Sequence, residues 1–255
     1  MPHTPNTVQR VNDIINNIFS TTLSKRLDVD QFMAVTTLIC NLPSYMNNAL
    51  FQRVLQYQAN DKQSQVNDIA TSDIITPTVS NSIFEDYMNN HLHTTDLSAN
   101  LYTILNPTLL KNDDTTVQRH YLIRSDFDVY VNEIVTRHPG LEFLADTPDF
   151  QLKYSETVIA RIFYQINVAG NERITMRELK QSNFLDIMKQ LDVEDDINKL
   201  NDYYSYEHFY VLYWYVAVNT MTHNSILYYT VHIHIQYHTS TCLTTVPVLC
   251  IFIFK

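Results

Sequence analysis

Apolar side chains recur at intervals of three and four residues over several stretches of this chain, and a short polar segment follows each stretch. Such spacing gathers apolar side chains on one face of a helix. The first stretch carries Val8, Val11, Ile14, Ile15, Ile18 and Phe19. A second stretch, within SETVIARIFYQIN, carries Val158, Ile159, Ile162, Phe163 and Ile166. The pattern predicts an all-α protein whose amphipathic helices are joined by brief polar loops.

The polar segment after the second stretch, NVAGNERITMRE at residues 167–178, has the length and spacing of an EF-hand calcium loop. Asn167 and Asn171 occupy loop positions one and five, and Glu178 occupies position twelve, where a bidentate carboxylate belongs. These three residues are the candidate metal ligands.

An EF-hand loop also needs an aliphatic residue at position eight, for the short strand that pairs two loops. It needs an apolar residue five positions later, on the exiting helix. Ile174 and Leu179 satisfy both requirements. The same spacing recurs at Leu27 with Phe32, Val79 with Phe84, Leu122 with Phe127 and Tyr204 with Phe209. Five such units predict tandem EF-hand-like helix-loop-helix pairs.

Composition along the chain divides it into three regions. Turn-forming and charged residues concentrate at residues 106–120 without apolar periodicity, which marks a boundary. We therefore expect an N-terminal EF-hand-like region at residues 1–105, a second EF-hand-like helical domain at residues 116–213, and a divergent tail at residues 214–255 that is irregular or weakly structured.

The ligand chemistry of the 167–178 loop is poor for calcium. Position three is Ala169, which has no side-chain oxygen, and position six is Glu172, where the sharp turn normally requires glycine. Glu178 is the one charged ligand. Thr175 and Glu178 also have the spacing of a capping box, which explains both residues without a metal. Calcium is thus a weak hypothesis, and no other cofactor is indicated.

Charge and glycine content exclude several functions. Acidic residues outnumber basic ones by 27 to 17, and the net charge of −10 repels phosphate backbones and anionic lipid surfaces. Only Gly140 and Gly170 are glycines, where average usage of roughly 7% would supply about eighteen. Glycine-rich phosphate loops are therefore disfavoured. No nucleophile elbow, zincin helix or cysteine with a nearby base is present, so the chain is not expected to be an enzyme.

The region from Val211 to Phe254 carries no charged side chain if histidine is counted as neutral. Its apolar run VPVLCIFIF has about half of the roughly 20 residues that a membrane-spanning helix needs, so we expect no membrane span. His223, His232, His234 and His238 suggest zinc only weakly, because no acidic partner lies near them in sequence. Three cysteines at irregular spacing and the lack of a secretory signal favour the cytoplasm or the nucleus.

Several segments together carry a resemblance to a known family: HPGLEFL, KYSETVIARIFYQIN, RITMRELKQSNFL, EDDIN and YYSYEHFYVLY. Through them the chain resembles the B-double-prime regulatory subunits of type 2A protein phosphatase, closely over residues 117–213 and more weakly around residues 8–19 and 84–92. The resemblance implies EF-hand-like helix pairs that contact the phosphatase scaffold and catalytic subunits and direct the holoenzyme to particular phosphoproteins.

The chain departs from this family after Tyr213. The family continues there into a charged calcium loop, whereas this chain continues with WYVAVNTMTHNSILYY, which has no acidic residue. The region that usually precedes the first matching helix is also missing, so we expect a truncated member. A stand-alone EF-hand calcium sensor or buffer is the alternative. Tyr203, Tyr204 and Tyr206 are either interface residues or core.

Overall fold

The computed structural model describes residues 14–20, 26–63, 77–92, 96–109 and 118–222. A helix covers residues 14–20. The strands and α-helices that follow are β1 (Arg26–Leu27), α2 (Asn47–Gln63), β2 (Val79–Ser80), α3 (Asn81–His91), α4 (Leu97–Leu105), α5 (Asp128–Arg137), α6 (Pro148–Ile166), α7 (Met176–Gln181), α8 (Phe184–Leu191) and α9 (Tyr206–Thr222). Short helical turns lie between them: η1 (Val35–Ile39), η2 (Ser44–Met46), η3 (Arg124–Phe127), η4 (Pro139–Leu144) and η5 (Ile197–Lys199). The all-α prediction is confirmed.

The first two predicted units form one EF-hand-like pair. Strands β1 and β2 pair antiparallel with Leu27 opposite Val79, and both side chains are buried. Five residues after each of them, Phe32 and Phe84 are also buried, and their rings meet edge to face at 5.6 Å. The core of the pair is therefore built around the residues that the spacing predicts.

The third and fourth units form a second pair. The amide N of Leu122 donates to the carbonyl O of Ile174 at 2.8 Å, and the reverse hydrogen bond is 3.0 Å long. Phe127 and Leu179, five residues later, are buried. The Phe163 ring on α6 contacts the Phe127 ring at 5.7 Å, so the stripe predicted for α6 faces this core.

The fifth unit, at Tyr204, is built differently. The backbone N of Tyr204 donates to the Leu200 carbonyl, and its carbonyl accepts a hydrogen bond from the Tyr154 hydroxyl at 2.5 Å. Its hydroxyl lies 2.7 Å from that of Tyr130. Within the part of the chain that the structure describes, Tyr204 has no strand partner. It anchors α9 to α6, as a core residue would.

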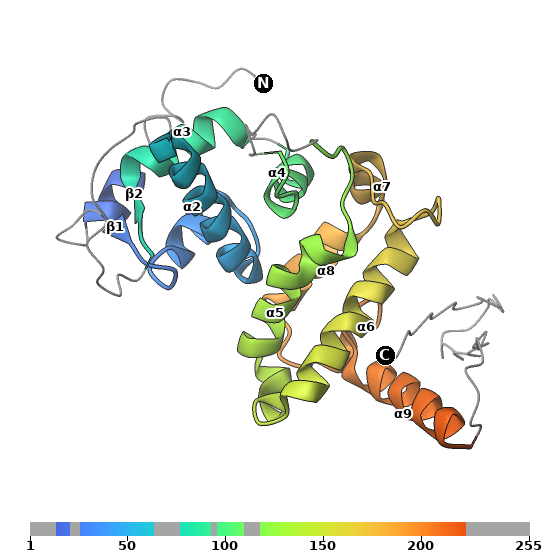
Figure 1. Cartoon of the computed structure of the whole chain (residues 1–255). Coiled ribbons are helices and arrows are strands. Elements are labelled where there is room, and N and C mark those ends of the chain that lie inside the picture. The colour runs from blue at the N-terminus through green and yellow to red at the C-terminus, as the bar shows by residue number, and fades with distance from the viewer. Residues whose placement is uncertain (1–13, 21–25, 64–76, 93–95, 110–117, 223–255) are drawn as a thin grey trace.

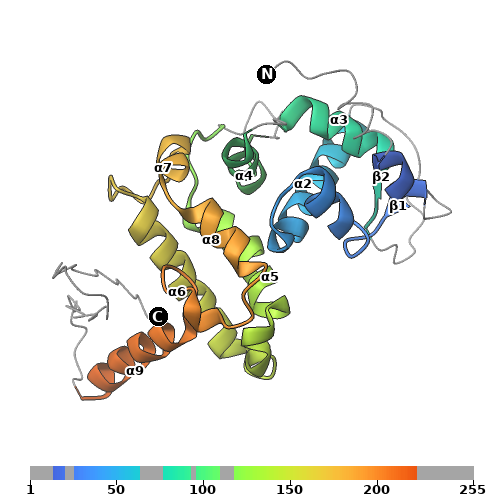
Figure 2. The same ribbon diagram turned by 180° about the vertical axis from the view of Figure 1, so that it is seen from behind.

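Helix α4 lies between the two pairs and packs against both α2 and α7. Figure 1 and Figure 2 show β1, β2, α2 and α3 on one side of α4 and α7 on the other, with α5 below α4, where it also packs against α2. The three-region division of the chain stays a prediction, and the tail from residue 223 lies outside the described residues. No helix among the described residues is long and apolar enough to cross a membrane.

Candidate calcium loops and the joint between the pairs

The 167–178 loop brings its predicted ligands into one hydrogen-bond network. The Asn167 side-chain Nδ2 donates to Asn171 Oδ1 at 3.0 Å and to the carbonyl of Arg173 at 2.5 Å. Asn167 Oδ1 in turn accepts from the backbone N of Asn171 at 2.9 Å. Loop positions one, five and seven are thus tied together by an amide group of the protein itself.

Glu178 closes the same loop from the start of α7. Its Oε2 accepts from the Thr175 backbone N at 2.9 Å and from the Thr175 hydroxyl at 2.8 Å, while the Glu178 N donates to Thr175 Oγ1, so the predicted capping box is confirmed. Its Oε1 accepts from the Ala169 backbone N at 3.3 Å. Partial burial raises the pKa of Glu178, but the hydrogen bonds from Thr175 and Ala169 outweigh it and leave the pKa below its ordinary value.

Glu172, at loop position six, adopts a backbone φ of 59°, the left-handed conformation that glycine normally supplies. Its carboxylate accepts from Arg124 Nε at 2.6 Å and from Arg124 Nη2 at 3.0 Å. The hydrogen bond from Arg124 lowers the pKa of Glu172. Because Arg124 follows Leu122 in the partner loop, this exposed ion pair links the two loops of the second pair.

The partner loop holds a carboxylate at the same position. Asp126 follows Leu122 by four residues, as Glu178 follows Ile174, and its Oδ2 accepts from the Ile123 backbone N at 2.8 Å. The Arg119 guanidinium, at position five, bonds both Asp126 oxygens at 2.9 and 3.2 Å. The Asp126 side chain is 2% exposed, so the pair is nearly buried. Sequence reasoning missed Asp126, although its spacing from Leu122 was the available signal.

The residues of the 167–178 loop do not fit tight calcium binding. The loop has a single carboxylate at a ligand position, that of Glu178, where an effective EF-hand brings several, and the Glu172 carboxylate is paired with Arg124. The Asn167 amide donates to two of the oxygens that a cation would need. Among the described residues no cluster of three or more His, Cys, Asp and Glu side chains is able to hold a metal. The tail histidines lie outside the described residues.

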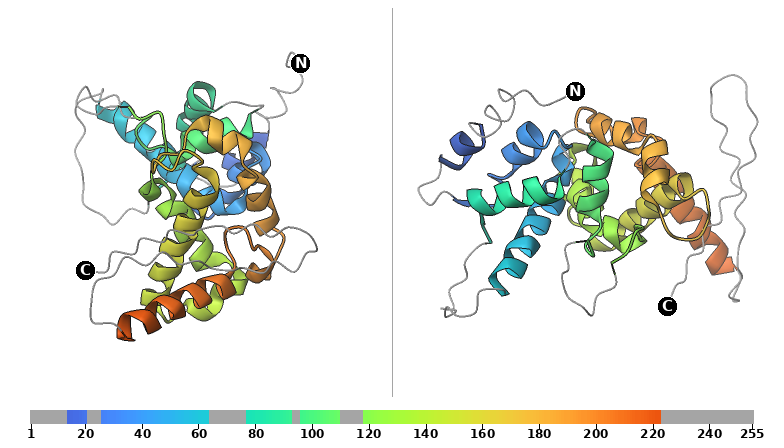
Figure 3. Two further views of the ribbon diagram at one scale, coloured as in Figure 1. Left: turned by 90° about the vertical axis from the view of Figure 1, so that its right-hand side faces the viewer. Right: turned by 90° about the horizontal axis from the view of Figure 1, so that it is seen from above.

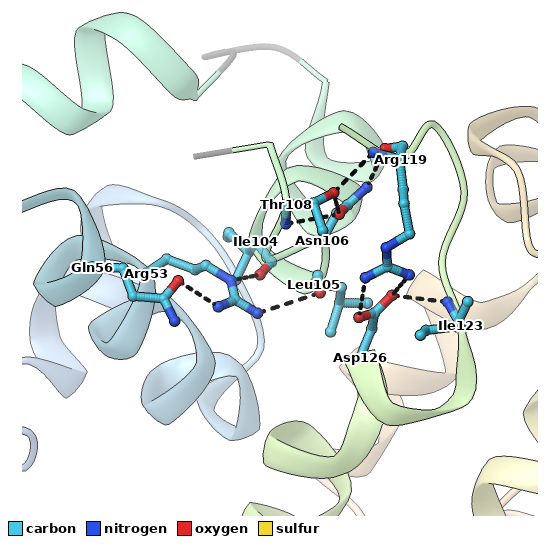
Figure 4. A network of polar contacts seen from close by, with 9 residues as sticks. All are labelled: Arg53, Gln56, Ile104, Leu105, Asn106, Thr108, Arg119, Ile123 and Asp126. Carbon is cyan, nitrogen blue, oxygen red and sulfur yellow. Dashed lines mark hydrogen bonds and ion pairs between the residues drawn. The ribbon is translucent and has the colours of Figure 1, made fainter. Parts of the chain in front are cut away.

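Arg53 on α2 joins the first pair to α4 (Figure 4). Its Nε donates to the Ile104 carbonyl at 2.5 Å and its Nη2 to the Leu105 carbonyl at 3.4 Å, while Nη1 bonds Gln56 Oε1. A cation at the last turn of a helix satisfies carbonyls that have no partner within the helix. At the other end, Asp96 caps α4 through Ala99 and also accepts from Lys180 on α7.

Asn106 holds the chain after α4 against the second pair. Its Nδ2 donates to the Arg119 carbonyl at 2.8 Å, and its Oδ1 accepts from the backbone N and the hydroxyl of Thr108. The Arg119 backbone N donates back to Thr108 Oγ1 at 3.0 Å. This network of hydrogen bonds connects the end of α4 to the Arg119–Asp126 pair.

A second contact between the halves surrounds His138. Asp192 accepts from the backbone N and the hydroxyl of Ser44, and the neighbouring Tyr45 ring stacks on the His138 ring at 5.9 Å. His138 Nδ1 accepts from Gly140 N, so Nε2 donates to the Glu194 carbonyl at 3.0 Å, and the ring is neutral. Burial lowers the pKa of His138.

Burial decides between the two alternatives, interface or core, for two of the three tyrosines. Tyr203 and Tyr204 are fully buried and therefore belong to the core. The Tyr203 hydroxyl donates to Asn183 Oδ1 at 2.7 Å. Tyr206 is partly exposed on α9.

Paired loops in series define this chain as an EF-hand protein, and an EF-hand domain family matches it over residues 96–194. The chain is 39% identical over 188 residues to the probable B''delta regulatory subunit of protein phosphatase 2A from Arabidopsis thaliana, a match that covers 73% of this chain and 30% of that protein. It is 48% identical over 92 residues to the Homo sapiens B'' subunit alpha, covering 36% of this chain and 8% of that subunit.

A chain of a solved PP2A PR70 holoenzyme is also similar, at 36% identity and a TM-score of 0.44, covering 52% of this chain and 46% of that one. The chain belongs to the B'' family of regulatory subunits of protein phosphatase 2A. It spans about a third of the length of the Arabidopsis relatives that it matches.

Proposed function

We propose that this chain is a non-catalytic regulatory module that binds the scaffold and catalytic subunits of protein phosphatase 2A and directs the choice of phosphoprotein substrates. The observation that carries the proposal is the 48% identity to a human B'' subunit over 92 residues. Serial helix pairs fixed by α4 supply a rigid surface of the kind that docking requires.

Reconstitution tests the proposal. The purified chain is passed over immobilised scaffold subunit, with and without catalytic subunit, and dephosphorylation of phosphoproteins is compared in its presence and absence. We expect retention on the scaffold and a changed substrate preference. A control variant, Leu122→Asp, puts a charge into the buried bridge with Ile174 and is expected to lose both effects together with its helical fold.

A folded chain that neither binds scaffold nor alters dephosphorylation would overturn the proposal. Circular dichroism of the same sample distinguishes that result from unfolding. Turnover of a phosphoester by the chain alone would instead indicate an enzyme.

The alternative function, a calcium sensor or buffer acting alone, has weaker support. The single carboxylate at a ligand position and the Asn167 amide network favour a loop that keeps its shape through its own hydrogen bonds. Titration calorimetry decides between the two functions: micromolar calcium binding that Glu178→Gln abolishes would support the sensor. A location in the cytoplasm or the nucleus stays a prediction.

A further inference from the structure

Four aromatic rings form a continuous row on the outer side of α9. Phe143 on η4 meets Tyr206 edge to face at 4.7 Å, Tyr206 lies 6.3 Å from Tyr210, and Tyr210 lies 6.2 Å from Trp214. The three rings of α9 are spaced four residues apart, which keeps them on one side of the helix. We call these four side chains the aromatic row.

Three of the four side chains of the aromatic row are exposed, whereas Phe209, on the inner side of α9, is buried. The inner side of α9 lies against α6, where Phe209 contacts Tyr154 and Tyr213 contacts Phe150. On the outer side, Phe143 is 59% exposed, Tyr210 45% and Trp214 49%. Figure 3 shows α9 at an edge of the molecule, away from the first pair. A contiguous exposed apolar surface of this kind marks an interaction site.

The charged side chains of the two segments that carry the aromatic row, residues 138–152 and 206–222, are all acidic. Arg161 of α6 bonds the Ser205 carbonyl and His208 at the start of α9. Glu142 precedes Phe143, Asp146 follows it by one helical turn, and Glu207 shares the face of Tyr210 and Trp214 on α9. Neither residues 138–152 nor residues 206–222 contain a lysine or an arginine. Among the described residues Glu142, Asp146 and Glu207 have no ion-pair partner. The surface therefore combines aromatic faces with unneutralised carboxylates.

This combination selects for cationic side chains. An arginine or lysine lies favourably over an aromatic face, and arginine also pairs with a neighbouring carboxylate through two hydrogen bonds. Nucleic acid and anionic lipid carry the wrong sign of charge for such a surface. We propose that the aromatic row and its carboxylates form a docking surface for an arginine- or lysine-bearing segment of a partner protein. This proposal does not depend on which phosphatase subunits the chain binds.

The only tryptophan of the chain, Trp214, lies in the aromatic row and reports on it directly. The probe is a twelve-residue peptide with arginine and leucine at helical spacing, added to the full chain at low salt while Trp214 emission is followed. We expect a saturable change in emission that weakens as salt rises. A matched peptide with glutamate in place of arginine is expected to produce no change.

Two double variants test whether peptide binding depends on the carboxylates of this surface or on the acidity of the whole chain. Glu142→Gln with Asp146→Asn removes carboxylates beside Phe143 and is expected to weaken peptide binding about fivefold, the upper range for exposed ion pairs. Asp30→Asn with Asp86→Asn removes the same charge from exposed positions of the first pair and should leave binding unchanged. Tyr210→Ala, which interrupts the row, should weaken binding further.

Several outcomes would overturn the proposal. One is equal weakening by the two double variants, and another is binding of the glutamate peptide as strongly as the arginine peptide. A third is the absence of any change in Trp214 emission. A Trp214 already shielded from acrylamide before peptide is added would mean that another part of the chain, or a second copy, covers the row, and light scattering would tell these two apart.

Discussion

The two loops of the second pair share a backbone plan but are held together by different chemistry. Leu122 and Ile174 form the same reciprocal bridge, and each is followed four residues later by a carboxylate that accepts from the chain three residues before it. In the first loop, a nearly buried Asp126 is neutralised by Arg119. In the second, the neutral amide of Asn167 joins the loop oxygens, and the charged groups are exposed.

This difference shows that loop pairing depends on the apolar positions, while the polar interior of each loop is free to vary. A guanidinium group stands beside the carboxylate of one loop, and an amide bridges the oxygens of the other. Each of these two groups donates hydrogen bonds to oxygens of its own loop. The two solutions differ in burial, and therefore in how much stability each one contributes.

The largest effect is expected from Arg119→Met. This change leaves the Asp126 carboxylate buried without its cation, and breaking a buried pair in this way typically costs about 3 kcal/mol. The free energy of unfolding in urea measures it. Arg124→Met is the matched control, because its pair with Glu172 is exposed on both sides and should cost about 0.5 kcal/mol.

Equal losses in the two arginine variants would break the comparison between the loops. They would mean that water reaches the Asp126 carboxylate once Arg119 is removed. Burial would then not make one ion pair more stabilising than the other.

Asn167→Asp is expected to have the next largest effect. The substitution replaces Nδ2, which donates to Asn171 Oδ1 and the Arg173 carbonyl, with an oxygen that cannot donate. The lost hydrogen bonds cost about 1–2 kcal/mol. Added calcium should recover part of this stability, because the variant loop offers the ion a second carboxylate beside the same oxygens. Thermal unfolding with calcium and with chelator measures both effects. An unchanged stability without calcium would show that the amide network does not hold the loop.

The apolar pattern predicted the pairs well because a position-eight residue and an apolar residue five positions later must both be buried. Leu27, Val79, Leu122 and Ile174 lie in two bridges, as the spacing requires. The same spacing misjudged Tyr204, whose backbone groups are bonded to Leu200 and Tyr154 rather than to a neighbouring loop. Spacing along the sequence cannot reveal that a hydroxyl on another helix donates to this carbonyl.

The joint between the pairs was beyond sequence reasoning for a related reason. Arg53 meets the end of α4 across about fifty positions of the chain, and Ser44 meets Asp192 across about one hundred and fifty. Polar contacts at such separations leave no periodic signal, because each depends on the packing of whole helices. The candidate ligands Asn167, Asn171 and Glu178 were found because a loop motif is local.

A smaller effect is expected from acid. Because the folded-state pKa of Glu178 is lowered, its contribution to stability is present above the unfolded pKa and is lost as the pH falls through the folded pKa. The Thr175 amide, which donates to Glu178, should shift in NMR spectra over the same acidic range. In Glu178→Gln this titration should disappear. A Thr175 shift that persists in this variant would assign the titration to another group, such as Glu172.

The smallest effect is expected from Glu172→Gly. Glycine adopts the φ of 59° without the strain that a side chain brings, which favours the variant by about 1 kcal/mol. Losing the exposed pair with Arg124 and adding freedom to the unfolded chain act in the opposite direction by a similar amount. The free energy of unfolding should therefore change by less than about 0.5 kcal/mol. Gly170→Ala is the matched control, since a side chain at φ 63° is strained although the space around it is open, and it should cost about 1 kcal/mol. A loss in Glu172→Gly larger than in Gly170→Ala would show that the exposed ion pair, rather than the backbone, holds the two loops together.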